Sequence, residues 1–260
     1  MADGQDHGGA MAAVIDPQES LAAIRTLTAK ALAGIPTGEP AFDCLGVVAR
    51  ECGITARMAE DVIEGFALDA ADWHPRRESD LYQYCYHVAG AVGVMMAVVM
   101  GVPADDDATL DRACDLGLAF QLANIARDIA EDDAAGRCYL PDDWLATLDI
   151  APGEHMKPHN RKKLALMGRW LADEAEQYEA SARVGAAHLP LRARWAVLSA
   201  AGIYGEIARK VRAADSHAWD QRIFTSRPEK FRWVRKAFVD AVANNPRAMD
   251  RDALWTRTRV

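Results

Sequence analysis

The sequence predicts an all-α protein, and three observations support this fold class. Apolar residues recur at helical spacing along nearly the whole chain. No alternating run of apolar and polar residues bounded by Asn-Gly or Asp-Gly marks a β-hairpin. The 260 residues, half of them hydrophobic and 26% charged, are enough to bury a substantial core. Disorder over most of the length is therefore excluded.

Local signals place the helices in order along the chain. Asp16 supplies an N-cap and Pro17 suits a first helical turn, so a helix begins there and continues to about Ala33. Glycines and prolines at positions 34–40 then break the chain. The helical pattern returns in the ranges 41–52, 55–70, 79–100 and 108–132, and, after a loop at Gly136, in the ranges 141–148, 160–187, 190–214 and 228–243.

No linker, internal repeat or low-complexity tract divides the chain, which favours a single helical domain. We expect an irregular N-terminal segment at 1–16, where several glycines occur, and the helical domain at 17–243. A flexible C-terminal tail is expected at 244–260, which contains Pro246 and several arginines.

The charge balance limits the partners of the chain. Its 30 basic and 38 acidic residues give a net charge of -8, which argues against nucleic acid as a partner because polyanion binding requires cationic surface. A phosphorylated ligand would then be held by local cations or by metal. The five cysteines are odd in number and form no CxxC pair, and the N-terminus has no secretory signal. A cytoplasmic location is therefore expected.

One segment, Leu81–Val102, has no charged side chains and raises the alternative of a membrane span. Its first half holds Gln83, His87 and three tyrosines, so the continuous apolar stretch is only Val88–Val102. A span needs about 20 apolar residues, whereas shorter stretches are typical of buried helices. We therefore expect a core helix.

The segment richest in polar side chains is Gln121–Asp133. On a helix, Asn124, Asp128 and Asp132 are spaced i, i+4 and i+8 and share one face. Gln121 lies one turn earlier. Like charges on one stripe repel, so the two aspartates destabilise an isolated helix by roughly 0.2–0.5 kcal/mol unless positive charge lies between them.

A divalent cation would supply that charge, because Mg²⁺ is held by one or two carboxylates together with substrate phosphates. Arg127 would add a bidentate contact to phosphate oxygens. The alternative is a solvated acidic face on which Arg127 pairs with Glu131. Interleaved apolar residues, such as Leu122 and Ile125, favour a buried helix whose polar groups need partners.

A second segment, Tyr84–Gly93, combines small residues with a tyrosine and a histidine one turn apart. Gly90 and Gly93 allow another backbone or a bulky ligand to approach closely. Taken alone, the segment is more typical of a tightly packed core helix, in which Tyr84 and His87 find partners, than of a ligand site.

Together the two segments resemble the squalene and phytoene synthase family, and its bacterial phytoene synthases most closely. The motifs read YCYHVAGAVG from Tyr84 and LGLAFQLANIARDIAEDDAAGRCYLP from Leu116, and the likeness extends over most of residues 17–230. The resemblance implies the isoprenoid synthase fold, a helical bundle around a central apolar cavity.

The resemblance also implies a reaction. Two geranylgeranyl diphosphates would condense head to head, through prephytoene diphosphate, to phytoene in carotenoid biosynthesis, with Mg²⁺ or Mn²⁺ as cofactor. The partner would be a prenyl diphosphate substrate. Peripheral membrane contact is implied as well, although no strongly basic amphipathic helix stands out in the sequence.

Site residues follow from matching this chain to the family motifs position by position. The implied metal ligands are Asn124, Asp128 and Asp132, and the implied catalytic residues are Tyr84, Asp128 and Asp132. The implied substrate-binding residues are Gln121, Asn124, Arg127, Arg137, Tyr139, Tyr204 and Arg222.

The resemblance breaks at the family's first aspartate-rich motif, DxxxD, which should lie on an earlier helix. No such motif occurs upstream of residue 80 in the expected place. Asp3, followed by Gly4 and Gln5, fits the last carboxylate of a severed motif. We therefore expect an N-terminally truncated chain with half a metal site and little synthase activity.

Two alternatives stay open. One is a squalene or dehydrosqualene synthase that uses farnesyl diphosphate. Squalene formation includes a reductive step that uses a nicotinamide cofactor, and the sequence has no GxGxxG motif after a strand that would bind this cofactor. The other is a non-catalytic family member. The missing first motif would permit this role, whereas the intact second motif argues against it because a non-catalytic protein would not need it.

Overall fold

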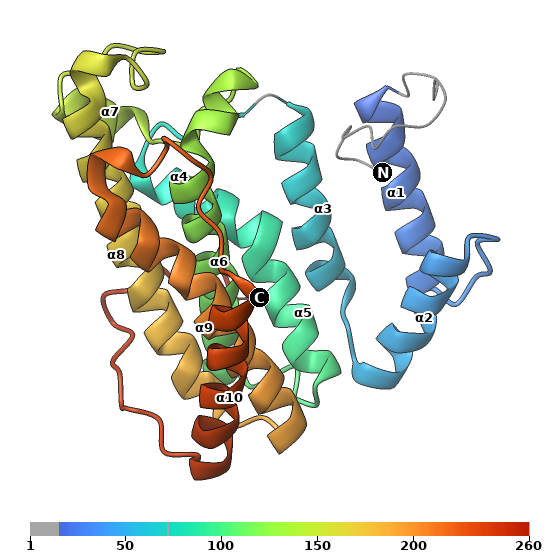
Figure 1. Cartoon of the computed structure of the whole chain (residues 1–260). Coiled ribbons are helices and arrows are strands. Elements are labelled where there is room, and N and C mark those ends of the chain that lie inside the picture. The colour runs from blue at the N-terminus through green and yellow to red at the C-terminus, as the bar shows by residue number, and fades with distance from the viewer. Residues whose placement is uncertain (1–15, 72, 260) are drawn as a thin grey trace. The chain divides into compact units, whose positions relative to one another are not determined.

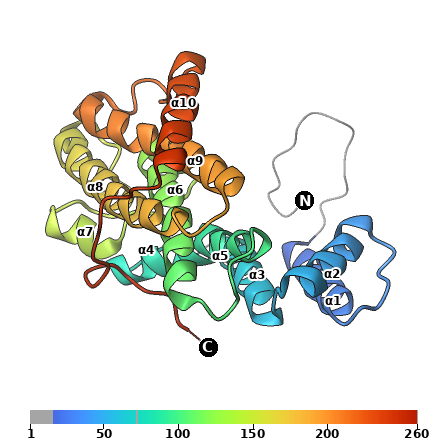
Figure 2. The same ribbon diagram turned by 90° about the horizontal axis from the view of Figure 1, so that it is seen from below.

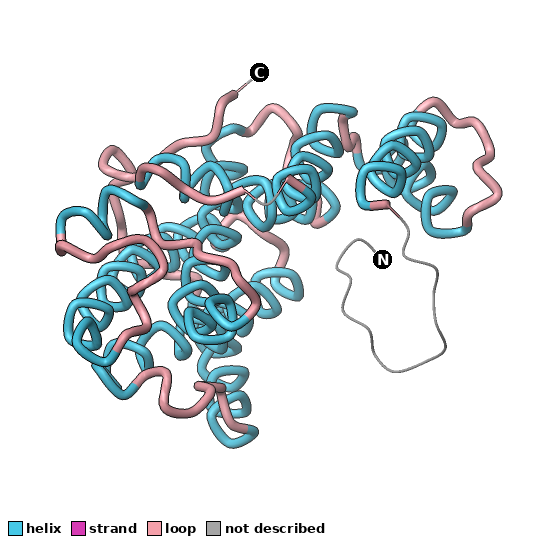
Figure 3. Tube along the Cα trace, turned by 90° about the horizontal axis from the view of Figure 1, so that it is seen from above, coloured by secondary structure: helices cyan, strands magenta, loops and turns pink. Residues whose placement is uncertain are grey.

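The computed structural model describes residues 16–71 and 73–259. These residues form helices joined by loops, with no strand among them, which confirms the all-α prediction (Figure 3). Asp3 and nearly all of the expected N-terminal segment lie outside the described residues. The chain divides into two compact units, Met1–Trp73 and His74–Val260, which are described one at a time.

The described part of the first unit contains three helices. They are α1 (Pro17–Leu32), α2 (Pro40–Cys52) and α3 (Ala56–Ala70), and α1 packs against both others. The start of α1 is as predicted, because the Asp16 carboxylate accepts a hydrogen bond from the Gln18 N–H at 2.9 Å. A Cβ at Gly46 would lie 2.4 Å from the Ala31 carbonyl oxygen, so α1 and α2 are in close backbone contact.

The second unit is a helical bundle with α6 at its centre (Figures 1 and 2). Its elements are α4 (Glu78–Cys85), the π-helical turn η1 (Tyr86–Gly90), α5 (Ala91–Val99), α6 (Asp107–Ala134), α7 (Asp142–Thr147), the 3₁₀ turn η2 (Pro158–Asn160), α8 (Arg161–Ala186), α9 (Leu191–Ala214), the 3₁₀ turn η3 (Asp215–His217) and α10 (Arg227–Ala243). Neighbours surround α6 on several sides, and Leu110, Leu118 and Leu122 are fully buried along it. This burial explains why its apolar residues do not form a single stripe.

The charge-free segment expected as one helix is interrupted by η1, where the backbone bonds follow i→i+5 spacing. Leu81 and Cys85 are fully buried, as expected for a core helix. Among the described residues, no helix combines the length and apolar character needed to cross a membrane. A Cβ at Gly117 would lie 2.4 Å from the Ala89 carbonyl oxygen, which confirms that the small residues serve close backbone packing.

Residues 244–259 form no helix, yet charged contacts hold them against α6. The Arg251 guanidinium donates two hydrogen bonds of 2.7 Å to the Asp115 carboxylate, whose side chain is fully buried. Arg257 donates to Asp107 at 2.5 Å. The flexibility expected for 244–260, and the boundaries expected for the domain at 17–243, stay predictions.

Candidate functional site

The C-terminal half of α6 carries the polar side chains that the sequence analysis selected. Asn124, Asp128 and Asp132 share one face of this helix, as their spacing predicts. The side chains of Asp128 and Asp132 are only 19% and 17% exposed, so neither extends freely into solvent. Leu122, Ile125 and Ala126 of the same helix are buried, so this part of α6 is anchored in the core.

Asp128 is held by two arginines from different parts of the chain. The Arg127 Nε donates to its Oδ1 at 2.7 Å, and a second hydrogen bond joins the Arg127 Nη2 to its Oδ2. Arg222, from the loop between η3 and α10, places its Nη2 3.0 Å from the same Oδ1 and its Nη1 3.5 Å from the Glu131 Oε1. The alternative in which Arg127 pairs with Glu131 on a solvated face is therefore wrong.

The negative charge of Asp132 is less fully balanced by nearby cations than that of Asp128. Its nearest cation is Arg137, whose Nη2 lies 3.7 Å from its Oδ1. Burial raises the pKa of Asp132 to about 6, with Arg137 opposing the rise and the charges of Asp128 and Glu131 adding to it. The carboxylate would be stabilised by a further positive charge.

Aromatic side chains stack in two pairs. Tyr84, from α4, is buried and stacks on Tyr139 with ring centroids 5.0 Å apart. Tyr204, from α9, stacks on Phe120 of α6 at 4.3 Å and remains partly exposed. Each predicted tyrosine thus lies against another aromatic ring.

The structure brings some of the predicted site residues into direct contact and leaves others near them on the same helix. Direct contacts join Arg127 and Arg222 through Asp128, Arg137 to Asp132, and Tyr84 to Tyr139. Gln121 and Asn124 are half-buried on α6, and within the described part of the chain their side chains make no hydrogen bond.

Several contacts were not anticipated from the sequence. Trp219 donates from Nε1 to the Ala126 carbonyl oxygen at 3.0 Å, which ties the loop of Arg222 to α6. His155 is buried, and its Nε2 lies 3.3 Å from the Asp133 Oδ1. Trp219 lies three residues before Arg222, which the resemblance had already marked as a substrate-binding residue, whereas no local signal marks His155.

The donor set on α6 suits a hard cation. Nowhere in the described ranges do three His, Cys, Asp or Glu side chains converge as a metal-binding cluster. Two carboxylates and one amide oxygen, from Asp128, Asp132 and Asn124, are nevertheless the kind of partial oxygen shell that Mg²⁺ uses when phosphate completes its coordination. The incomplete compensation of Asp132 agrees with this fit.

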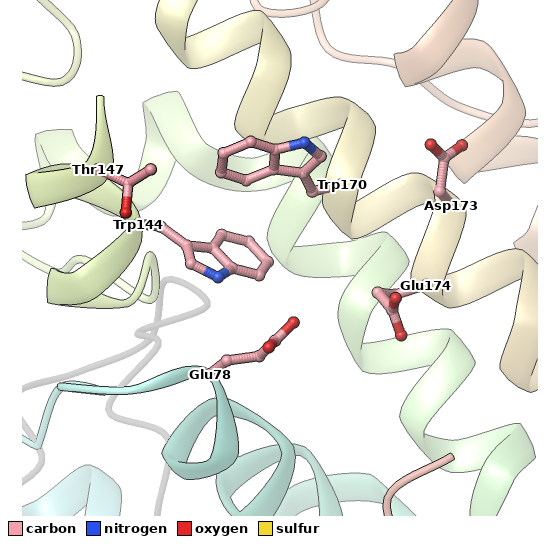
Figure 4. Close-up of a pocket in the computed structure, with 6 residues that line it drawn as sticks. All are labelled: Glu78, Trp144, Thr147, Trp170, Asp173 and Glu174. Atoms are coloured by element: carbon pink, nitrogen blue, oxygen red, sulfur yellow. The ribbon is translucent and has the colours of Figure 1, made fainter. Parts of the chain in front are cut away.

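A separate pocket of about 410 Å³ opens among α4, α7 and α8. Figure 4 shows its lining: Glu78, Trp144, Thr147, Trp170, Asp173 and Glu174. This lining has no arginine or lysine to meet phosphate oxygens, whereas Arg127 and Arg222 lie beside the carboxylates of α6. The candidate site is therefore the polar face of α6 and not this pocket.

Comparison with known proteins agrees with this assignment. Residues 2–229 match the family described as squalene/phytoene synthase. A phytoene synthase from Pseudescherichia vulneris is 46% identical, over 98% of this chain and 83% of that protein. A 15-cis-phytoene synthase from Pantoea ananas is also 46% identical, over 89% of this chain and 74% of that protein.

A solved structure adds independent support for the fold. The crystal structure of a dehydrosqualene synthase in complex with ligand superimposes with a TM-score of 0.78 at 27% identity, covering 87% of this chain and 79% of that chain. The helical bundle, the acidic face of α6 and the match over most of the sequence lead to one conclusion: the chain belongs to the squalene/phytoene synthase family.

Proposed function

We propose that the chain is a phytoene synthase that condenses two geranylgeranyl diphosphates head to head, through prephytoene diphosphate, to phytoene in carotenoid biosynthesis. The observation that carries this proposal is the polar face of α6, where Asp128 lies between Arg127 and Arg222 beside the incompletely compensated Asp132. The names of the similar relatives support the choice of phytoene as product.

In this proposal the residues of α6 hold the diphosphate end of the substrate. Asn124, Asp128 and Asp132 would hold Mg²⁺ or Mn²⁺, which when bound neutralises charge on the departing diphosphate. Arg127 and Arg222 present planar guanidinium groups that match phosphate oxygens in bidentate geometry. Because both arginines contact Asp128 in this structure, they would exchange that carboxylate for phosphate when substrate enters.

Further side chains would position the substrate. Arg137 would contact phosphate near Asp132, and Gln121 would donate from its amide one turn before Asn124 on α6. The amide of Gln121 and the guanidinium of Arg137 both donate hydrogen bonds, as a diphosphate requires.

The aromatic residues would act on the prenyl part of the reaction. Departure of diphosphate leaves positive charge on carbon, and the faces of tyrosine rings attract cations. Tyr84, Tyr139 and Tyr204 would supply such faces, and the burial of Tyr84 would keep water from the reacting carbon.

The test is incubation of the purified chain with labelled geranylgeranyl diphosphate and Mg²⁺, with the extracted product identified by its mass. Phytoene is the expected product, and it should disappear in the variants Asp128→Asn and Asp132→Asn while both remain folded. The proposal fails if the folded chain makes no phytoene under any condition, or if both variants match the parent rate. The identity of the product tests the function, and its rate tests the separate expectation of low activity.

A second candidate is dehydrosqualene synthesis from farnesyl diphosphate, which the likeness to a solved dehydrosqualene synthase favours. The two reactions share their chemistry and differ in prenyl length. Supplying both diphosphates in competition distinguishes them, because the masses of the C40 and C30 products differ.

A further inference from the structure

The exposed side of α10 is apolar. The helix packs on α9 through its other side, where Ala237 and Ala241 are buried. Figure 2 shows α10 at the edge of the second unit, on the far side of α9 from α6. Four large apolar side chains, each 48–65% exposed, follow one another at i, i+7, i+8 and i+11 and so form one stripe. This outer face of α10 consists of Phe231, Phe238, Val239 and Val242.

The apolar surface continues onto α9. Trp195 is partly exposed and meets Phe238 edge to face, with ring centroids 5.3 Å apart. Its Nε1 donates to the Val234 carbonyl oxygen at 2.9 Å, which fixes the indole beside α10. Leu191, one turn earlier on α9, is 48% exposed. A contiguous patch of this kind marks an interaction surface more often than an isolated apolar residue does.

The same helix is basic in a chain of net charge -8. Between Arg227 and Ala243 there are five basic and two acidic residues, which gives the helix a charge of +3. Both acidic residues are compensated within the protein, Glu229 by Lys210 at 2.7 Å and Asp240 by Lys236 at 2.7 Å. The surplus charge is therefore positive.

Two of the basic residues lie at the outer face of α10. Arg235 is one turn after Phe231 and one turn before Val239, and Arg227 is one turn before Phe231. Neither arginine has an ion-pair partner among residues 16–71 and 73–259. Exposed phenylalanine and valine beside unpaired arginine is the pattern of a helix that lies at a lipid–water interface.

We propose that the outer face of α10 docks on a membrane surface that carries anionic headgroups. The apolar side chains would enter the boundary between headgroups and acyl chains, while Arg227 and Arg235 would meet lipid phosphates. Charge favours this occupant over a second copy of the chain, because two copies joined through this face would bring the arginines together. The sequence pattern alone did not single out this helix, since its apolar stripe becomes evident only once α9 is known to cover the other side.

The docking face is linked along the chain to the candidate site. Phe224 is 68% exposed and lies two residues after Arg222, the residue that reaches Asp128. Lys210 donates to the Phe224 carbonyl oxygen at 2.9 Å and to Glu229 at the start of α10, so the loop and the helix are held together. A prenyl substrate dissolved in the bilayer could pass from the docking face to this loop, and that step rests on the proposed function. Binding of the chain to vesicles does not depend on the proposed function.

The experiment is flotation of the full chain with vesicles of phosphatidylcholine, with and without phosphatidylglycerol. We expect the chain to float with the anionic vesicles, and less so as NaCl concentration rises. The variant Phe231→Ser/Val239→Ser/Val242→Ser should bind at least tenfold more weakly, since each apolar side chain that enters the interface contributes to binding. Each of Arg227→Gln and Arg235→Gln should weaken binding to anionic vesicles by roughly fivefold.

A matched triple variant, Ile35→Ser/Val47→Ser/Leu166→Ser, removes three exposed apolar side chains elsewhere and should bind as the parent does. Thermal melting confirms that each variant is folded. The proposal is overturned if the parent floats with neither kind of vesicle, or if the α10 triple variant binds like the control. It is also overturned if gel filtration shows a dimer that only the α10 variant dissociates, because the face would then be occupied by protein. Turnover of detergent-dispersed geranylgeranyl diphosphate is measured separately, so failure of docking and failure of the proposed function are distinguishable.

Discussion

The Arg222 Nη2 lies 3.0 Å from the Asp128 Oδ1, so a loop after α9 supplies a cation to the acidic face of α6. Arg222 is 56% exposed, and an exposed ion pair contributes at most about 1 kcal/mol to stability. A guanidinium that binds diphosphate contributes more, because hydrogen bonds to charged groups are worth roughly 1.5–3 kcal/mol. The residue is therefore expected to matter more for catalysis than for folding.

We predict that Arg222→Gln lowers kcat/KM for prenyl diphosphate by about 10- to 100-fold and changes the free energy of unfolding by less than about 1 kcal/mol. Steady-state kinetics and urea unfolding measure the two effects. Arg169→Gln is the matched control, because Arg169 is 49% exposed and pairs at 3.2 Å with Asp215, which is not one of the acidic residues of α6. Equal loss of activity in both variants would contradict the prediction.

The second prediction concerns pH. Burial raises the pKa of Asp132 to about 6 from a usual value of 3.8, so the folded chain binds this proton more tightly than the unfolded chain does. The resulting stability is fully present below about pH 4 and is lost as the pH rises through about 6. The total change is up to roughly 3 kcal/mol. Asp132→Asn should remove this pH dependence and be the more stable form above pH 6.

Urea unfolding between pH 4 and pH 8, in the presence of a chelator, measures this dependence. Asp143→Asn is a suitable control, since Asp143 is exposed at the start of α7. An unchanged pH profile in the Asp132 variant would show that this carboxylate is not the group responsible.

The helices could be predicted closely because their signals are local. Asp16 caps α1 as expected, and Gly53 ends α2 with φ near +82°, a conformation that glycine adopts without strain. The observed bounds lie within two residues of the predicted ranges, apart from the interruption at η1. An apolar run does not encode where one π-helical turn is inserted, so the sequence carried no sign of it.

The candidate site could be predicted only in part for a similar reason. Helical periodicity alone placed Asn124, Asp128 and Asp132 on one face. The partners of these residues come from distant segments, as Arg222 does for Asp128, and no spacing rule connects them. Arg222 and the other distant partners were predicted only from the resemblance to a family. Neither helical periodicity nor that resemblance predicted the contact of His155 with Asp133.

The third prediction concerns the C-terminal segment. Burial raises the pKa of Asp115, while hydrogen bonds from Arg251 and Ser181 oppose the rise. Removing one partner of a buried ion pair typically costs 3–5 kcal/mol, because it leaves an uncompensated charge. Arg251→Met should therefore destabilise the chain by about that amount at pH 7. Urea unfolding tests this, with Arg247→Met as the control because Arg247 is exposed. Similar stability of the two variants would show that the segment beyond α10 is not needed to hold α6.

The last prediction concerns the packing of η1 on α6. A Cβ at Gly117 would lie 2.4 Å from the Ala89 carbonyl oxygen and 2.6 Å from the Gly90 Cα, and neither backbone atom can move independently. In an open helix, Gly→Ala would stabilise by about 1 kcal/mol through helix propensity. Here overpacking should reverse the sign and cost about 1–3 kcal/mol. Ala130→Gly, at a half-buried position of the same helix, measures the propensity contribution together with the loss of one methyl group, and urea unfolding compares the two variants. Stabilisation by Gly117→Ala would mean that η1 and α6 are not in backbone contact, and that the glycine has another purpose.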